Sequence, residues 1–106
     1  MVRQDTIIWL WRHNNKRGPA IPRKNYDEVV SKIISELESN NIGQIDLFQL
    51  IDHIRYTLSS GFQGNKDWYI LHVKQDLEAR GIIKISVNRD CVQTISLTRK
   101  HSVFKG

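Results

Sequence analysis

The sequence predicts a mixed α+β fold in which three amphipathic helices are followed by a β-hairpin. Apolar residues recur at helical spacing in three segments that begin near residues 25, 46 and 66. From Ile83 onward the apolar period changes to two, and Asn88-Arg89-Asp90 forms the turn between two short strands. Three helices and then a hairpin are the element order of a winged helix, in which the hairpin is the wing. The length of 106 residues corresponds to one domain.

An apolar segment at residues 6–12 precedes the helices. It is rich in β-branched and aromatic residues, which favours an additional N-terminal strand. A Gly-Pro turn leads from it to a second short strand at residues 20–23, where Pro22 fits an edge because proline has no N–H to donate. We expect residues 1–24 to be an arm that packs on a winged-helix domain of residues 25–99, followed by a basic tail at 100–106.

Both sides of the N-terminal strand are apolar. Trp9 and Trp11 share one side, and Ile8 and Leu10 share the other. The strand can pair with the wing, with its own return, or with a second chain. We expect it to fold over the third helix and bury Trp68. Because a small monomer has little chain with which to cover both sides of a strand, the sequence also favours a homodimer.

The ends of the helices carry capping signals. Asn25 is expected to cap the first helix, with Glu28 at the capping-box position, and Asp46 to cap the second. The segment Gly43-Gln44-Ile45 resembles the short strand that precedes the second helix in winged-helix domains. The third helix is expected to begin at Lys66 or Asp67 and to end near residue 80, with Gly81 in the left-handed position that follows many helices.

The third helix has two different faces. Ile70, Val73 and Leu77 form the stripe expected to enter the core. The opposite face carries Trp68, Leu71, His72, Gln75 and Ala79, and it includes no lysine or arginine.

The run from Trp68 to Ile83 resembles the third helix of an uncharacterised family of small bacterial winged-helix proteins. That family carries an aromatic pair and then the pattern V-x-x-D-L-E-A-K/R-G-h-I, behind a Gly- and Lys-containing loop that here is Gly61–Lys66. The early apolar strand and Tyr26 at the opening of the first helix are also similar. The chain departs from the pattern at Tyr69, where a second tryptophan is common, and it lacks a Pro-Gly-Gly type of loop. The resemblance implies the fold and no activity.

The charge is divided along the chain. Residues 1–25 carry a net charge of +5, residues 26–83 carry −4, and residues 84–106 carry +4. Two basic segments that lie together would attract a polyanion, although charge at chain ends also aids solubility. In helix-turn-helix relatives the third helix enters the major groove of duplex DNA, and the wing and an N-terminal arm contact the backbone or minor groove. The residues predicted to bind nucleic acid are Lys66, His72, Gln75, Lys84, Arg89, Arg12, Lys16 and Arg17.

The alternative function is protein interaction or dimerisation without nucleic acid. A recognition helix usually brings at least one cation toward the phosphates, and the outer face of the third helix has none. Aromatic residues are enriched at the centres of protein interfaces. The residues predicted to form an interface are Trp9, Trp11, Trp68 and Leu71.

No catalytic or metal-binding constellation emerges. The four histidines have no ligand-type spacing, and Gly61-x-x-Gly64 lacks the Lys-Ser/Thr of a phosphate-binding loop. Cys91, expected on the returning strand of the wing, has no nearby base to activate it. We therefore expect no enzyme activity, no cofactor and no small-molecule substrate.

The composition indicates a globular cytoplasmic protein of a bacterium or an archaeon. A hydrophobic content of 40% excludes wholesale disorder. A single cysteine fits a reducing compartment. The longest apolar run is far shorter than the roughly 20 residues that a membrane helix needs.

Overall fold

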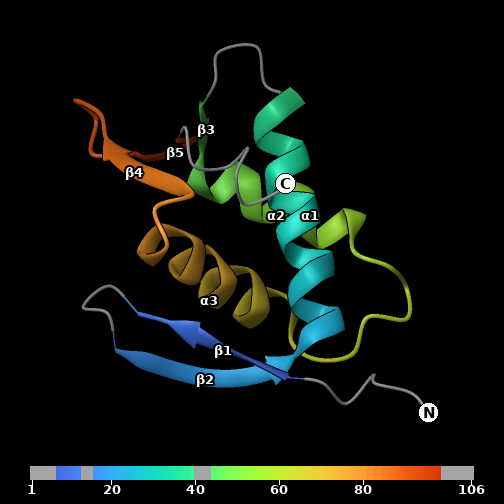
Figure 1. Ribbon diagram of the computed structural model, residues 1–106. Helices are drawn as coiled ribbons and strands as arrows, with labels where there is room; N and C mark the ends of the chain where they lie inside the picture. The colour runs from blue at the N-terminus through green and yellow to red at the C-terminus, as the bar shows by residue number, and fades with distance from the viewer. Residues whose placement is uncertain (1–6, 13–15, 40–43, 99–106) are drawn as a thin grey trace.

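The computed structural model describes residues 7–12, 16–39 and 44–98. The basic tail at 100–106, His13 and His101 lie outside these ranges. Within them the order of elements is β1 (Ile7–Trp11), β2 (Arg17–Pro22), α1 (Arg23–Ser39), β3 (Gln44–Asp46), α2 (Leu47–Thr57), α3 (Lys66–Ala79), β4 (Ile83–Val87) and β5 (Gln93–Leu97). The described strands form two antiparallel sheets, the pair β1-β2 and a three-stranded sheet of order β3-β5-β4 (Figure 1). The mixed α+β prediction is confirmed.

The core lies where the three helices meet the three-stranded sheet. The apolar stripes predicted for the helices are the surfaces that pack there, because burying them removes apolar area from water. Apolar residues with no exposed surface come from every helix and from β5. They are Val29, Ile33, Leu50, Ile54, Ile70, Val73, Leu77 and Ile95.

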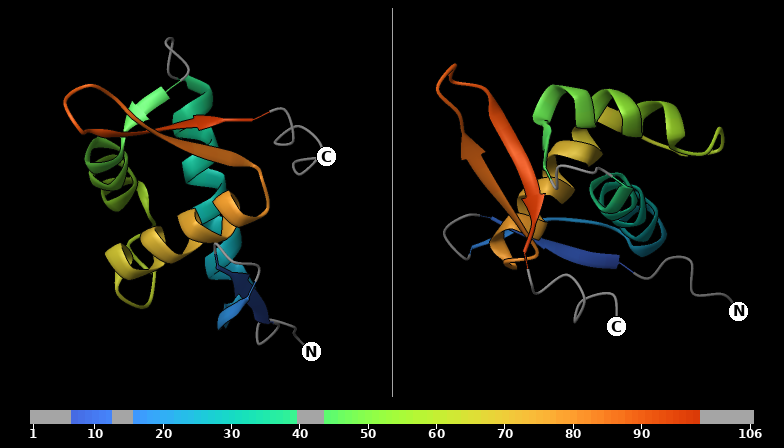
Figure 2. Two further views of the ribbon diagram at one scale, coloured as in Figure 1. Left: turned by 90° about the vertical axis from the view of Figure 1, so that its left-hand side faces the viewer. Right: turned by 90° about the horizontal axis from the view of Figure 1, so that it is seen from above.

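The N-terminal strand pairs with its own return, which is one of the three arrangements that the sequence left open. In the β1–β2 hairpin, Ile8 lies opposite Ile21 and Trp9 opposite Ala20. Leu10 is fully buried, whereas Trp9 is 48% exposed, so the strand has one covered side and one open side. The hairpin packs along α3 on the side away from the three-stranded sheet (Figures 1 and 2).

The second strand and the first helix begin earlier than expected. Strand β2 already starts at Arg17, and α1 follows it at Arg23 without a connecting loop. The capping box predicted for the first helix is therefore wrong. The amide of Asn25 is buried and donates from Nδ2 to the carbonyl oxygen of Gln63 at 3.2 Å. Glu28 accepts from the backbone N–H of Ser59 at 2.7 Å. Both side chains tie the α2–α3 loop to α1.

The other helix signals are confirmed. Asp46 accepts from the backbone N–H groups of Phe48 and Gln49 at 2.8 and 3.2 Å, which caps α2. The cap of α3 is Asn65, which the sequence had not indicated, and it accepts from the N–H of Trp68 at 2.9 Å. Gly81 follows α3 with φ +79°, in the left-handed region that glycine enters without strain.

The placement of Cys91 on a strand is wrong. Val87 pairs with Gln93, so residues 88–92 form the connection between β4 and β5. Cys91 lies within this connection, exposed and with φ +63°. The turn is longer than the sequence suggested because the Oδ1 atom of Asn88 accepts two backbone N–H groups, those of Asp90 at 2.8 Å and Val92 at 3.0 Å. These local bonds replace a sheet ladder at this point.

Candidate nucleic-acid interface

The outer face of α3 lies between the β1–β2 hairpin and the β4–β5 hairpin (Figure 2, left). Trp68 is 37% exposed and Leu71 is 41% exposed. The expectation that the N-terminal strand buries Trp68 is therefore wrong, although the strand does pack on α3. The strand contacts α3 on the neighbouring side of the helix, where Trp11 donates its backbone N–H to Asp76 at 2.8 Å.

Two predicted contact residues lie on this face. The ring of His72 stacks on the indole of Trp68, with 4.1 Å between the ring centroids and 20° between the planes. Its Nδ1 lies 2.9 Å from the carbonyl oxygen of Trp68. Because a carbonyl only accepts, Nδ1 is the donor in this bond, and in the neutral ring Nε2 is the acceptor. Gln75, also on this face, is half-exposed.

The cations of α2 and of the body of α3 are neutralised within the protein. Arg55 forms two hydrogen bonds to the carboxylate of Asp67, at 2.8 and 3.2 Å. That bonding is the main cause of the raised pKa of Arg55. Lys74 lies 3.7 Å from Glu78. The outer face of α3 is thus neutral in the structure as well as in the sequence.

The cations predicted on the two flanks of α3, at the β1–β2 turn and on the β4–β5 hairpin, differ from Arg55 and Lys74. Arg12 and Lys16 border the β1–β2 turn, Lys84 projects from β4, and Arg89 lies in the β4–β5 turn. All four are exposed, and none forms an ion pair with another residue that the structure describes. The end of β1, the start of β2 and the β4–β5 turn lie on the same side of the molecule (Figure 1). The fold thus places two groups of positive charge on either side of α3, and no described acidic side chain pairs with them.

Two further predicted cations differ from these four in their contacts or position. The guanidinium carbon of Arg17 lies 5.2 Å from the centroid of the Trp9 ring, a cation–π contact on the open side of the hairpin. Lys66 is half-buried at the first residue of α3, and the helix separates it by roughly 20 Å from the end near Arg80. Of the eight residues predicted to bind nucleic acid, Lys66 is the one that the fold does not bring to the flanks or the outer face.

A buried carboxylate joins the N-terminal hairpin to two helices, and the sequence analysis missed it. Asp76 has no exposed surface. Its Oδ1 accepts from the N–H of Trp11, and its Oδ2 accepts from the hydroxyl of Tyr26 at 2.7 Å and from Nε of Arg80 at 2.8 Å. Every donor comes from a different part of the chain, so this group fixes the hairpin against α1 and α3.

The carboxylate also sets the protonation of its neighbours. Burial raises the pKa of Tyr26, and the charge of Asp76 and its hydrogen bond raise it further. Burial is the largest single effect on Arg80 and lowers its pKa, but the hydrogen bond to Asp76 and the charges of Tyr26 and Asp76 together outweigh it, so the pKa of Arg80 is raised. The sequence carried a signal for this buried group, because Tyr26, Asp76 and Arg80 are among the residues that carry the family resemblance. Those positions hold the fold together.

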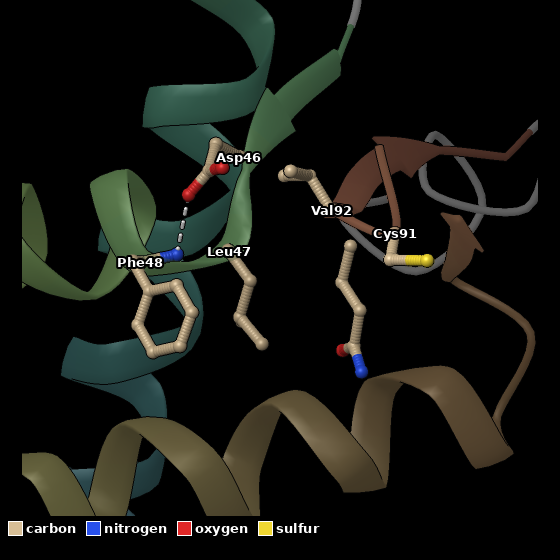
Figure 3. Close-up of a pocket in the computed structure, with 6 residues that line it drawn as sticks. Asp46, Leu47, Phe48, Cys91 and Val92 are labelled. Atoms are coloured by element: carbon tan, nitrogen blue, oxygen red, sulfur yellow. Dashed lines mark hydrogen bonds between the residues drawn. The ribbon is translucent and has the colours of Figure 1, made fainter. Parts of the chain in front are cut away.

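A shallow hollow lies between the start of α2 and the β4–β5 turn (Figure 3). It has a volume of about 220 Å³, and its lining includes Leu47, Phe48 and Val92. Its one charged lining residue, Asp46, already uses a carboxylate oxygen to cap α2. Sites that enclose drug-sized ligands are usually larger, about 300–1,000 Å³.

The described residues contain no cluster of three or more His, Cys, Asp or Glu side chains placed to hold a metal ion. Among the same residues, no helix combines the length and the apolar character needed to cross a bilayer.

Comparison with known proteins identifies a family and no function. A family model described as "Family of unknown function (DUF6958)" matches residues 10–90, which include the last two residues of β1 and every element from β2 to β4. No curated protein and no solved structure is significantly similar to the chain. The match covers well over half of the sequence. The chain therefore belongs to the DUF6958 family, a family of unknown function.

Proposed function

We propose that the chain is a winged-helix domain that binds duplex DNA. The described elements from α1 to β5 follow the winged-helix order, with the short strand β3 before α2 and the β4–β5 hairpin as the wing after α3. The observation that carries the proposal is the position of the free cations. Arg12 and Lys16 lie on one flank of α3, and Lys84 and Arg89 lie on the other.

In this arrangement the flanks and the helix α3 would make different kinds of contact with DNA. Phosphate contacts supply most of the affinity for DNA, and here the flanks would make them. The neutral face of α3 would meet the base edges, where Gln75 is suited to adenine and the Nε2 atom of His72 offers an acceptor. Four phosphate contacts correspond to a slope of about −3.6 for the logarithm of the binding constant against the logarithm of the salt concentration.

The experiment is a titration of labelled duplex DNA followed by fluorescence anisotropy at several salt concentrations. We expect Lys84→Ala and Arg89→Ala each to weaken binding and to reduce the magnitude of the salt slope by about 0.9. Lys32→Ala is the matched control, because it removes one positive charge from the middle of α1. Binding that is absent at 50 mM salt, or that does not depend on salt, would exclude the proposal.

A protein-interaction or dimerisation module is the second candidate. The half-exposed pair Trp68 and Leu71, in a neutral setting, favours it. Sedimentation of the intact chain tests this candidate directly. If the chain is a homodimer that Trp68→Ala converts to a monomer, the outer face of α3 is an interface between copies and is not available to DNA.

The cytoplasm is the location we propose for either function. Cys91 is an exposed free thiol, which a reducing compartment preserves.

A further inference from the structure

The open side of the β1–β2 hairpin is an aromatic surface that the duplex-binding proposal does not use. Trp9 and Trp11 project from it, and both are more than a third exposed. They lie two apart on β1 and so point to the same side, about 6.8 Å apart, and the register of the ladder with β2 shifts between them. Across the ladder Trp9 lies opposite Ala20, and Ile7, two residues earlier on β1, lies opposite Pro22. The small side chain of Ala20 leaves the indole of Trp9 standing above the sheet.

The same surface is positively charged. Arg17 lies opposite Trp11 in the ladder, and its guanidinium stacks on Trp9. Arg12 and Lys16 border the surface at the turn. The described residues of the hairpin include no aspartate or glutamate. The surface therefore combines planar aromatic groups with a net positive charge.

The combination of exposed indoles and positive charge favours one class of ligand for this surface over the others. A second copy bound through a two-fold axis would place this patch against itself and bring like charges together, which is unfavourable. Duplex DNA would satisfy the charges but not the indoles, because its bases are stacked inside the helix. A single-stranded nucleic acid offers both phosphates and unpaired bases.

We propose that the open side of the β1–β2 hairpin binds single-stranded nucleic acid. Unpaired bases stack on Trp9 and Trp11, and Arg17, with Arg12 and Lys16 beside it, binds the phosphates. This site shares Arg12 and Lys16 with one flank of the proposed duplex-binding surface, but its indoles and Arg17 are distinct from the outer face of α3.

The hairpin supports such a site because it is held rigidly. Leu10 and Ile21 anchor its inner side in the core. The hydrogen bond from the backbone N–H of Trp11 to Asp76 fixes the end of β1. A platform positioned before the ligand arrives loses little conformational entropy on binding.

The experiment compares a labelled oligo(dT) strand with a duplex of equal length, using the full chain. Binding is followed by anisotropy and by quenching of tryptophan fluorescence. We expect Trp9→Ala and Trp11→Ala each to weaken oligo(dT) binding by about 5- to 150-fold, the range that loss of one base–aromatic stack produces. Trp9→Phe keeps an aromatic ring and should retain most of the affinity. Trp68→Ala, which removes a comparably exposed indole from α3, should leave oligo(dT) binding unchanged.

The variants separate this proposal from the duplex-binding one. Lys84→Ala should weaken binding to the duplex and not to oligo(dT), so either proposal can fail alone. Equal loss of oligo(dT) binding in Trp9→Ala and Trp68→Ala would overturn the site. Oligo(dT) binding that is unchanged in Trp9→Ala and Trp11→Ala would also overturn the site, because charge alone would then explain the binding. A homodimer that Trp9→Ala converts to a monomer would assign the surface to a second copy. Far-UV circular dichroism checks the folding of each variant.

Discussion

Asparagine in place of Asp76 tests how the N-terminal hairpin is held to the helices. The two side chains have the same shape, and the remaining oxygen can still accept from the backbone N–H of Trp11. The amide nitrogen then replaces the oxygen that accepts from Tyr26 and Arg80. The hydroxyl of Tyr26 can reverse its role, but the guanidinium of Arg80 has only donors. The substitution leaves a cation without its partner.

The expected loss follows from the burial of the pair. Removing one partner of a buried ion pair costs about 3–5 kcal/mol. Asp76 is completely buried, but the side chain of Arg80 is 29% exposed and keeps part of its hydration. We therefore expect a loss near the lower limit, about 3 kcal/mol. For a domain of this size that loss corresponds to a fall in Tm of roughly 12–20 °C.

Tyr26→Phe isolates one bond of the same group. It deletes a hydrogen bond to a charged acceptor, for which we expect a loss of about 1.5–3 kcal/mol. Both variants are compared by urea unfolding at pH 7. Tyr56→Phe and Asp90→Asn are the matched controls, because Tyr56 is 85% exposed and Asp90 lies in the exposed β4–β5 turn.

Hydrogen exchange reports the same perturbation locally, since Asp76→Asn should speed exchange at the backbone N–H of Trp11. A loss below about 0.5 kcal/mol for Asp76→Asn would refute the reasoning, because exposed substitutions commonly have effects of that size. Equal effects of Tyr26→Phe and Tyr56→Phe would refute it as well.

Two further predictions concern pH and backbone conformation. Because the pKa of Tyr26 is raised in the folded chain, its contribution is complete below the ordinary tyrosine pKa of about 10 and is lost as the pH rises above it. We expect stability from urea unfolding at pH 9–11 to fall by up to about 1.4 kcal/mol per pH unit more steeply in the native chain than in Tyr26→Phe. Parallel curves would contradict this. Gly64 has φ +117°, and a Cβ there would collide with the ring of Tyr69. We expect Gly64→Ala to lower the free energy of unfolding by about 1–3 kcal/mol or more, whereas Gly61→Ala, in open space, should be neutral or slightly stabilising. Similar effects of the two alanines would contradict the assignment.

Local patterns in the sequence predicted most of the elements. The apolar stripes of the helices, the cap at Asp46 and the left-handed Gly81 depend on residues close together in the chain. The helix cap that was predicted wrongly involves side chains that bind residues distant in the sequence. Asn25 and Glu28 have the spacing of a cap, but they bind the α2–α3 loop instead.

The candidate site was likewise predictable from local sequence in part, and the rest depended on tertiary contacts. The sequence by itself located the positive charge near the two ends of the chain and showed that the outer face of α3 is neutral. It also assigned Trp9 and Trp11 to one side of a strand, since strand geometry alternates sides. Only the tertiary structure decided which side of that strand is open, that Arg17 stacks on Trp9, and that Trp68 stays half-exposed. The physical reason is that Asp76 gathers donors from β1, α1 and α3, and no local pattern records a contact between residues 65 positions apart.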